Sequence, residues 1–336
     1  MKTLPEGWKE MEIEDIALVD SGQGAPQGDK WYKGNEIFVK AGDLNNLSEG
    51  KFVGDFCSNI GYDAIEKYKL KKYSTNSIVF PKSGMSVKTD NIALLKYDSY
   101  IVNHLAIIQI SKNNECDHKY LYYFLKRMKI SNLSLNSAYP SIRLQDIKKF
   151  RIILPPIGTQ KKIAAILEKA ERLKEWRKEA DRLTDDFLKS TFLEMFGDPV
   201  KNPKEWDFYK FDKVGSLQRG KSKHRPRDAP ELLGGPYPLI QTGEVANSGG
   251  YIREYYQTYS EIRLNQSKMW PTGTLCITIV NGGVKIPIPP MELQNKFSDI
   301  VVGVEQIREY QRASNKQIDC FFNNLMQKAF KGELAC

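Results

Sequence analysis

A stretch of the chain from Pro155 to Gly197 has a second copy from Pro289 to Gly332, and this repeat constrains the fold more than any other feature. Each copy opens with Pro-Pro-x-x-x-Gln and continues as a long run in which apolar residues recur at alternating three- and four-residue steps. Equivalent positions differ in residue number by a constant offset of 134, as for Gln160 and Gln294. This spacing is typical of helices that pack against another helix.

The first of these helices is expected to run from Thr159 to Phe196, between a proline pair and the glycine that stops it. At about 1.5 Å per residue it would be roughly 57 Å long, more than a small domain can bury. One such segment alone would be typical of a core helix, but two copies favour an intramolecular antiparallel coiled coil. The predicted helix-pair and subunit interface consists of Ile163, Ile166, Ala170, Leu173, Leu183 and Phe187 in the first copy and Phe297, Val304, Ile307 and Phe321 in the second.

The segment before each helix is also repeated. A Pro-x-x-Trp motif places Trp8 and Trp206 at an offset of 198, and the run Asn76–Phe80 resembles Gly273–Ile277 at an offset of 197. The offset then falls from 197 to 134. The second block therefore lacks a segment that the first block possesses, and the length of this segment equals the difference between the two offsets. The missing segment corresponds to the run after His104, the helix expected from Asp117 to Ile130 and the turn near Tyr139. Either the second block is a degenerate remnant, or something outside this sequence completes it.

The fold class predicted from these patterns is α+β, with two mixed α/β domains and two long antiparallel helices that form an intramolecular coiled coil. The first block, with its short apolar strands and amphipathic helix, lacks the regular alternation of a doubly wound sheet. We expect domain 1 at 1–154, the first long helix at 155–197, a shortened domain 2 at 198–288 and the second long helix at 289–336.

The net charge of +9 is carried by the two blocks, because residues 1–154 and 198–288 each contribute +4 while the helical segments contribute +1 and 0. Basic blocks joined by nearly neutral helices suit DNA-facing domains on a spacer, although +4 is ordinary for a protein domain. The N-terminal residues lack an apolar run of the signal-peptide type and no stretch approaches a membrane span, which predicts a cytoplasmic protein without membrane contact.

Signs of catalysis are missing from the sequence. Cys116 and His118 are close together but lack two further ligands, so no metal site is predicted. There is no GxxxxGK[ST] loop for ATP, no glycine-rich cofactor loop and no Asn/Asp-Pro-Pro-aromatic motif of an amino-methyltransferase. We therefore expect no catalytic residue and no cofactor in this chain.

The repeated motifs resemble those of the specificity subunits of type I restriction-modification systems. The resemblance rests on the Pro-x-x-Trp opening of both blocks, the Pro-Pro-x-x-x-Gln start of both helices, the run Met195–Pro199 and the run Ala329–Leu334. It covers essentially the whole chain, and the shortened second block is the one departure from it.

The resemblance implies a sequence-specific DNA-binding protein that catalyses nothing by itself. Each block would be a target-recognition domain that reads one half of a split site in double-stranded DNA, and the helices would set the spacing and dock methyltransferase subunits, through which restriction subunits join. S-adenosylmethionine, ATP and magnesium would be bound by those partners. The shortened block puts the second half-site in doubt, so it is expected to be relaxed, absent or supplied by another copy.

Reading DNA needs polar side chains at groove edges above a scaffold held by phosphate contacts. In the first block the candidates lie on three loops, and in the second on a basic cluster that aligns with the first of those loops. Each could equally be an ordinary solvated loop or charge run. The candidates are Gln23, Gln27, Lys30, Lys82, Ser83, Ser86, Lys88, Tyr139 and Ser141 in the first block, and Arg219, Lys221, Lys223, His224, Arg225 and Arg227 in the second.

Three other interpretations remain open. One is a half-functional specificity subunit that acts mainly as a coiled-coil scaffold for assembly. A scaffold with no DNA function is the second. The third is a stand-alone nuclease or methyltransferase, which would need a carboxylate cluster or cofactor loop that the sequence does not show.

Overall fold

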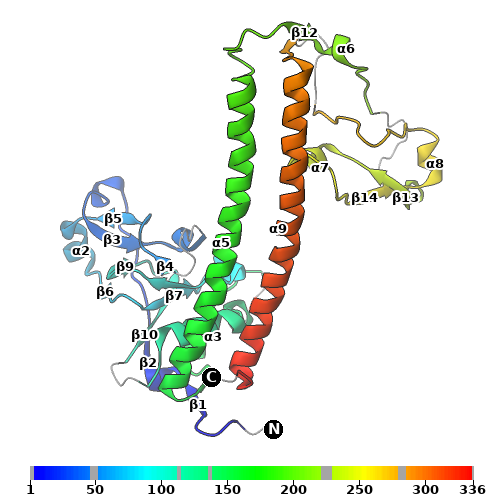
Figure 1. Ribbon diagram of the computed structural model, residues 1–336. Helices are drawn as coiled ribbons and strands as arrows, with labels where there is room; N and C mark the ends of the chain where they lie inside the picture. The colour runs from blue at the N-terminus through cyan, green and yellow to red at the C-terminus, as the bar shows by residue number, and fades with distance from the viewer. Residues whose placement is uncertain are drawn as a thin grey trace. The chain divides into compact units, whose positions relative to one another are not determined.

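The structure is a computed structural model that describes residues 4–45, 52–111, 115–134, 138–220, 229–278 and 285–334. The chain forms two compact units, the first from Met1–Thr184 with Gln306–Cys336 and the second from Asp185–Glu305. Both long helices cross from one unit to the other, so the units do not end where the predicted domains end. Figure 1 labels the elements of each unit.

The strands of the first unit form three sheets. The smallest pairs β1 (Lys9–Glu12) with β11 (Arg151–Leu154). The largest has the order β2 (Ala17–Ser21), β10 (Leu105–Ile110), β7 (Ile78–Pro81), β8 (Ala93–Leu95) and β4 (Phe52–Val53). The third has the order β5 (Ser58–Ile60), β3 (Glu36–Val39), β9 (Ser99–Ile101) and β6 (Lys72–Tyr73), and its β3–β9 pair is parallel.

Short helices close this unit. They are α1 (Ile13–Ile16), α2 (Tyr62–Tyr68), α3 (His118–Met128) and α4 (Leu144–Lys148), with single turns of 3₁₀ helix at Asp29–Trp31, Ala41–Asn45, Met85–Thr89 and Ile130–Leu133. The strands and helix predicted for the first block are confirmed in β3, β7, β10 and α3. Strand β10 lies between β2 and β7, a position that suits its β-branched residues, and Leu105, Ile107 and Ile108 are fully buried.

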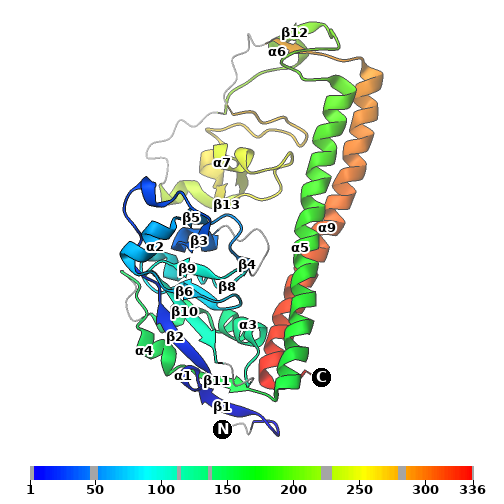
Figure 2. The ribbon, with the colours of Figure 1, turned by 90° about the vertical axis from the view of Figure 1, so that its left-hand side faces the viewer.

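Helix α3 joins the five-stranded sheet to the first long helix (Figure 2). Asp117 caps it by accepting a 2.9 Å hydrogen bond from the backbone N–H of Tyr120. From its other side, the Tyr123 hydroxyl donates to Glu171 at 2.8 Å and Lys126 forms a 2.6 Å ion pair with the same carboxylate. Glu171 is buried, and these two donors compensate for the loss of its hydration.

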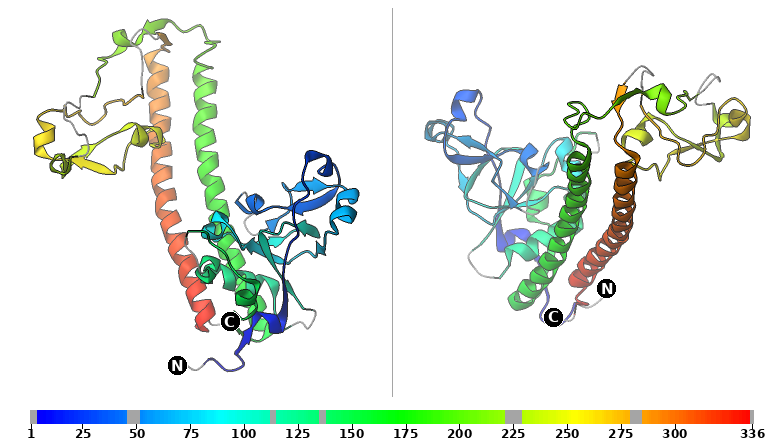
Figure 3. Two further views of the ribbon diagram at one scale, coloured as in Figure 1. Left: turned by 180° about the vertical axis from the view of Figure 1, so that it is seen from behind. Right: turned by 45° about the horizontal axis from the view of Figure 1, so that its top comes forward.

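The two long helices are α5 (Ile157–Phe196, 40 residues) and α9 (Met291–Lys331, 41 residues). Gly197 and Gly332, which follow their ends, have φ of +77° and +71°, the left-handed geometry of a helix stop. In the first unit, α5 before residue 184 and α9 after residue 306 lie side by side in antiparallel order (Figure 3). Lys174 pairs with Asp319 at 2.7 Å, and the Gln311 side chain donates to Thr184 Oγ1 at 2.8 Å. The predicted fold class is confirmed.

The residues of the predicted helix-pair and subunit interface differ in burial. Ile163, Ala170 and Val304 are buried, and Ile166 and Phe297 are half-buried. The other five predicted residues are exposed by two fifths or more: Leu173, Leu183, Phe187, Ile307 and Phe321. The apolar period misleads here because the described contacts between the helices near Thr184 are polar, and because α5 near Ala170 is buried against the core of the first block, which α3 helps to form.

The second unit contains two small sheets. One pairs β12 (Phe208–Lys210) with β15 (Lys285–Pro287), and the other pairs β13 (Leu233–Leu239) with β14 (Gln257–Tyr259). Its short helices are α6 (Phe211–Val214), α7 (Thr242–Ala246) and α8 (Glu261–Leu264), with a 3₁₀ turn at Pro230–Leu232. Around the helices, Phe297 of α9 contacts Phe192 and Phe196 of α5, with ring centroids 5.6 and 5.3 Å away.

The sequence repeat is visible in the strand register. In the first unit Glu10 faces Ile153 and Met11 faces Ile152, and in the second Phe208 faces Pro287 and Tyr209 faces Ile286. These pairs are related by the same offsets of 198 and 134 that relate the sequences. Both strand pairs lead into a proline pair and a long helix. The second copy therefore keeps this strand pair and its connection to the helix.

The sheet around strand β7 of the first block is not repeated among the described residues of the second block. The segment Gly273–Ile277, which resembles strand β7 in sequence, is not a strand, and Leu275 is 75% exposed. Strand β7 is held by β10 on one side and β8 on the other. The gap in the second copy removes the counterparts of both neighbours, and among the described residues no strand pairs with the backbone of this segment.

Candidate DNA interface

Three backbone segments meet at the turn Val102–His104, which joins β9 to β10. The glycine-rich loop binds it from one side, because Gln23 N–H donates to Ile101 O at 2.9 Å and Asn103 N–H donates to Gln23 O at 2.8 Å. From the loop after β7, Lys82 N–H donates to His104 O at 2.9 Å. The turn therefore holds two of the loops that the sequence predicts separately.

The third predicted loop is attached to the second. Ser83 and Ser141 form an isolated antiparallel bridge, and Gly84 N–H donates to Pro140 O at 2.9 Å. The Ser83 hydroxyl also lies 2.8 Å from Nδ1 of His104. Backbone hydrogen bonds thus hold two stretches that are distant in sequence side by side, which fixes the backbone positions from which their side chains extend.

The outer surface of this cluster is exposed and mixed in character. Tyr139 is 68% exposed and Met85 is 60% exposed, while Lys88, Ser141 and His104 are also exposed. Lys82, Ser83 and Ser86 are half-buried. We call the set Lys82, Ser83, Met85, Ser86, Lys88, His104, Tyr139 and Ser141 the loop cluster. Hydroxyl, amine and imidazole groups beside an exposed tyrosine can donate to phosphates and to base edges.

Sequence reasoning misses two members of the loop cluster. The position of His104 at the start of a strand favours a structural role, and Met85 is apolar, so neither is a candidate contact from sequence alone. The sequence signal that could have identified His104 is its position between two apolar strand runs. A polar residue at such a position lies in a turn and is exposed.

Gln23 is a framework residue as well as a candidate contact. Its side-chain oxygen accepts a 3.2 Å hydrogen bond from Lys71 N–H, and the Lys71 amine pairs with Asp20 at 2.5 Å. Burial raises the pKa of Asp20, but hydrogen bonds from Lys71, Ser21 N–H and Tyr73 outweigh it and hold that pKa below its ordinary value. The loop approaches the turn closely, because a Cβ on Gly22 would lie 2.0 Å from the Ile101 carbonyl oxygen.

Gln27 and Lys30 are not part of the contacts at the turn Val102–His104. Among the described residues, neither side chain forms a hydrogen bond with this turn. Gln27 donates to its neighbour Ala25 O at 3.1 Å and is exposed. Lys30 lies with its amine 4.7 Å from the Trp31 ring centroid, and Lys67 lies 4.8 Å from the same ring. The pair of lysines on one tryptophan forms a second basic feature, and Lys67 is not among the predicted contacts.

Only the start of the basic cluster of the second block lies within the described residues. Arg219 is described and exposed, and the other five predicted contacts lie outside the described residues: Lys221, Lys223, His224, Arg225 and Arg227. All of the DNA contacts named from sequence stay predictions.

The exposed apolar residues of the helices also repeat. In the first unit Leu173, Trp176 and Leu183 of α5 are 42%, 66% and 53% exposed and share one face. The equivalents of the first two in the repeat are Ile307 and Tyr310 of α9, which are 51% and 79% exposed. We call Leu173, Trp176 and Leu183 the α5 stripe, and Ile307, Tyr310 and Phe321 the α9 stripe. Exposed apolar rows of this kind mark surfaces for protein partners.

Within the described part of the chain there is no cluster of three histidine, cysteine, aspartate or glutamate side chains that could hold a metal ion. None of the described helices combines the length and apolar character that a membrane crossing requires.

A mixed α/β block whose loops gather beside one turn, attached to two long antiparallel helices, is typical of a modular binding protein. The family model for the type I restriction modification DNA specificity domain matches residues 5–180. The chain therefore belongs to this family.

One relative is similar to about half of this chain. The specificity subunit of the type I restriction enzyme MjaIX from Methanocaldococcus jannaschii is 31% identical over 172 residues, which is 50% of this chain and 38% of that protein. The match thus spans well under half the length of that relative.

A solved structure concerning complex assembly and conformational transition of the type I restriction-modification system is similar in fold, with a TM-score of 0.54, 15% identity and coverage of 99% and 100% of the two chains. The S subunit of the type I restriction-modification system of M. genitalium gives a TM-score of 0.48 at 14% identity over 98% of each chain.

Proposed function

We propose that the first block of this chain reads one half of a split site in double-stranded DNA, and that the helix pair docks methyltransferase subunits. The observation that carries the DNA half of the proposal is the loop cluster, in which two separately predicted loops are joined to each other by a backbone bridge beside the turn Val102–His104. A set of exposed polar groups held by backbone hydrogen bonds is pre-organised, so little entropy is lost when they bind a groove.

The charge distribution supports the same proposal. The first block contributes +4 to the net charge, and Lys82 and Lys88 stand on the loop cluster. The lysines on Trp31 extend the basic surface in the sequence-independent role of binding phosphates. Methylation and cleavage would belong to partner subunits that bind S-adenosylmethionine, ATP and magnesium, and this chain would contribute recognition and no catalytic group.

The α5 and α9 stripes support docking. Each presents an aromatic residue, Trp176 or Tyr310, with an aliphatic neighbour three residues earlier. Aromatic side chains are enriched among the residues that dominate protein interfaces. Because the two stripes occupy equivalent positions of the repeat, we propose that they bind two copies of one partner.

The second block is proposed to read its half-site weakly or not at all. Its described strands are confined to two two-stranded sheets, while the first block has sheets of five and four strands. A scaffold in which only the helices function is the alternative, and it predicts no dependence of DNA binding on the loop cluster.

A salt titration of DNA binding separates these proposals. Log K for the chain with its methyltransferase partner should fall steeply and linearly with log salt. The variants Lys82→Ala and Lys88→Ala should each reduce the slope by about 0.9 for every phosphate that is no longer neutralised. Lys189→Ala, an exposed lysine on α5, is the matched control and should leave the slope unchanged. Binding that ignores salt and all of these variants would favour the scaffold.

A further inference from the structure

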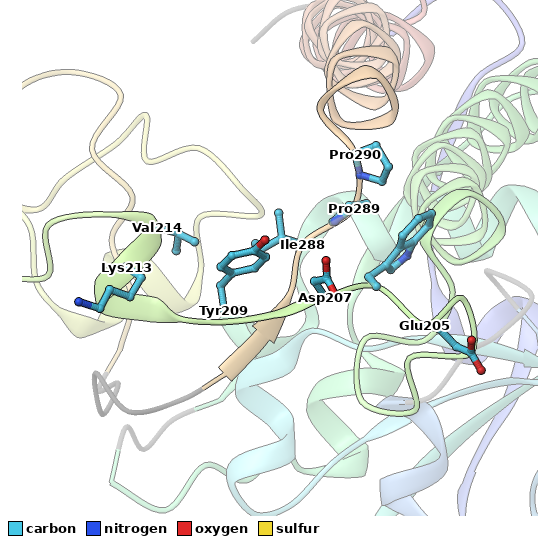
Figure 4. Close-up of a pocket in the computed structure, with 9 residues that line it drawn as sticks. Glu205, Asp207, Tyr209, Lys213, Val214, Ile288, Pro289 and Pro290 are labelled. Atoms are coloured by element: carbon cyan, nitrogen blue, oxygen red, sulfur yellow. The ribbon is translucent and has the colours of Figure 1, made fainter.

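A cavity of about 510 Å³ lies where β12 and β15 lead into α9. Its apolar lining comes from Trp206, Tyr209, Val214, Ile288, Pro289 and Pro290. Figure 4 shows that these residues belong to three neighbouring pieces of chain: the start of the second block, helix α6 and the segment that joins β15 to α9. All of them belong to the second unit.

The equivalent residues of the first unit are in the core. Val214 corresponds to Ile16 and Ile288 to Leu154 by the offsets of the repeat. Ile16 is 3% exposed and Leu154 is 4% exposed, whereas Val214 is 47% exposed. The cavity is therefore a core position of the repeat that has lost its covering element.

The first unit shows what covers this position. The N-terminal turn of α3 lies on Gln160, whose Oε1 accepts a 2.8 Å hydrogen bond from Asp117 N–H and whose Nε2 donates to Glu115 O at 2.8 Å. The Tyr120 hydroxyl then donates to Ile153 O at 2.7 Å. Gln160 is fully buried beneath this turn.

In the second unit the receptor side of this contact is kept and the covering helix is missing. Gln294, the equivalent of Gln160, repeats the hydrogen bond to the first proline of the pair, since its Nε2 donates to Pro289 O at 2.7 Å as Gln160 Nε2 does to Pro155 O at 2.8 Å. Among the residues that the structure describes, no donor is found for Oε1 of Gln294. The counterpart of α3 falls within the segment that the second block lacks.

Two differences on α9 define what a replacement helix must look like. Glu171, which binds Lys126 from the later turns of α3, corresponds to Glu305, and Glu305 is already paired with Arg253 of the second block. Glu168, which binds Lys119, corresponds to Val302, which is 54% exposed. Because Glu305 is already paired, a docking helix would bind here through its first turns, and the residue at the place of Lys119 should be apolar.

We propose that the cavity and the adjoining surface at the start of α9 together form a docking site for the N-terminal turns of an amphipathic helix from a separate polypeptide. That helix presents a free backbone N–H to Oε1 of Gln294, a tyrosine hydroxyl to the carbonyl of Pro287, the equivalent of Ile153, and an apolar side chain to Val302. This is helix-in-groove recognition with the internal repeat as its template. It goes beyond the DNA-reading function and does not depend on it.

The test uses the full chain and a labelled peptide with the sequence of Glu115–Lys129 carrying Lys119→Leu. Fluorescence anisotropy should show saturable binding of one peptide per chain. Val214→Trp, which fills the cavity without touching α9, should raise the Kd at least tenfold, and Gln294→Ala should raise it about five- to tenfold through the missing hydrogen bond. The same peptide with Lys119 retained should bind more weakly, because its amine would be placed on Val302.

Gln317→Ala, an exposed glutamine of the same helix, is the matched control and should leave the Kd unchanged. Circular dichroism melting checks that the variants remain folded, and Val214→Trp keeps the test decisive if Gln294→Ala weakens the start of α9. Absence of saturable binding, or binding that is the same in every variant, overturns the proposal. So does self-association of the chain that Val214→Trp abolishes, because the occupant would then be a second copy.

Discussion

The Nδ2 of Asn315 in α9 donates a 2.9 Å hydrogen bond to the carboxylate of Asp181 in α5, and the separation of these two residues in sequence, 134, is the offset of the helix repeat. Each copy of the repeat therefore contacts the other at the same position. The neighbouring contact, from Gln311 to Thr184, lies one helical turn away. This arrangement places a point of approximate two-fold symmetry on a polar pair in the middle of the helix contact.

Polar pairs in a helix contact set the register at some cost in stability. Asn315→Leu alone should lower the stability of the first unit by about 1–3 kcal/mol, because it leaves the half-buried Asp181 carboxylate without this donor. The double variant Asp181→Leu with Asn315→Leu should recover most of that loss. Thermal unfolding of the single and double variants measures both effects, and a double variant that is less stable than either single one would contradict the assignment.

Arg253 and Glu305 are proposed to anchor the second block on α9 as Lys126 and Glu171 anchor the first block on α5. Glu305 has a side-chain exposure of 13%, so its charge is poorly hydrated, while Arg253 at 41% is partly screened by water. Arg253→Glu should make the second block more sensitive to limited proteolysis, and the swap Arg253→Glu with Glu305→Arg should restore resistance. A coupling free energy of about 0.5–3 kcal/mol is expected for residues in contact. Independent, additive effects would show that the pair does not anchor the block.

The stability of the first unit should fall as the pH drops below about 6.5. Burial lowers the pKa of His118 from its ordinary value of 6.5, an effect that Asp117 partly opposes. Since the unfolded chain then binds the proton more tightly than the folded chain, acid favours unfolding, and the loss is complete once the pH is below the folded pKa. His118→Gln should flatten the stability profile between pH 7 and pH 5, measured by denaturant unfolding. His104→Gln, at an exposed turn, is the control, and an equal flattening by this control would refute the explanation.

The α5 and α9 stripes should each bind one partner subunit. Trp176→Ala should remove one partner copy from the complex, Tyr310→Ala the other, and the double variant both, because truncating an aromatic anchor costs an interface about 2 kcal/mol or more. Mass photometry of the assembled complex reads the copy number directly. Lys178→Ala, an exposed change on the same helix, should leave two copies in place. Loss of both copies from either single variant would argue against two independent sites.

The sequence predicts the large elements of this fold better than their contacts. The repeat of Gln160 at Gln294 correctly locates two helices, because proline, glutamine and glycine act within a few residues of themselves. Leu173, which the apolar period assigns to the helix-pair and subunit interface, is 42% exposed, and the described contacts of Gln311 and Asn315 with α5 are polar. Those contacts depend on which residue lies opposite, and a single sequence does not contain that information.

The same limit applies to the candidate site. Lys82 and Tyr139 are candidates from loop position alone, and nothing local indicates that the bridge between Ser83 and Ser141 joins their loops. His104 cannot be identified as part of the site from the sequence alone, because its hydrogen bond with Ser83 is a long-range contact. The cavity beside Val214 can be anticipated only as a missing segment, since the offset shows that residues are absent but not what surface their absence exposes.

The loop cluster of the first block is proposed to read DNA sequence. Selection from a pool of random-sequence duplexes by the chain in complex with its methyltransferase subunits tests this most directly. We predict enrichment of one short defined half-site, abolished by Tyr139→Ala with Ser141→Ala and kept on Arg219→Ala. Enrichment of no sequence, or of a half-site that survives the loop-cluster variants and vanishes with Arg219→Ala, would contradict it.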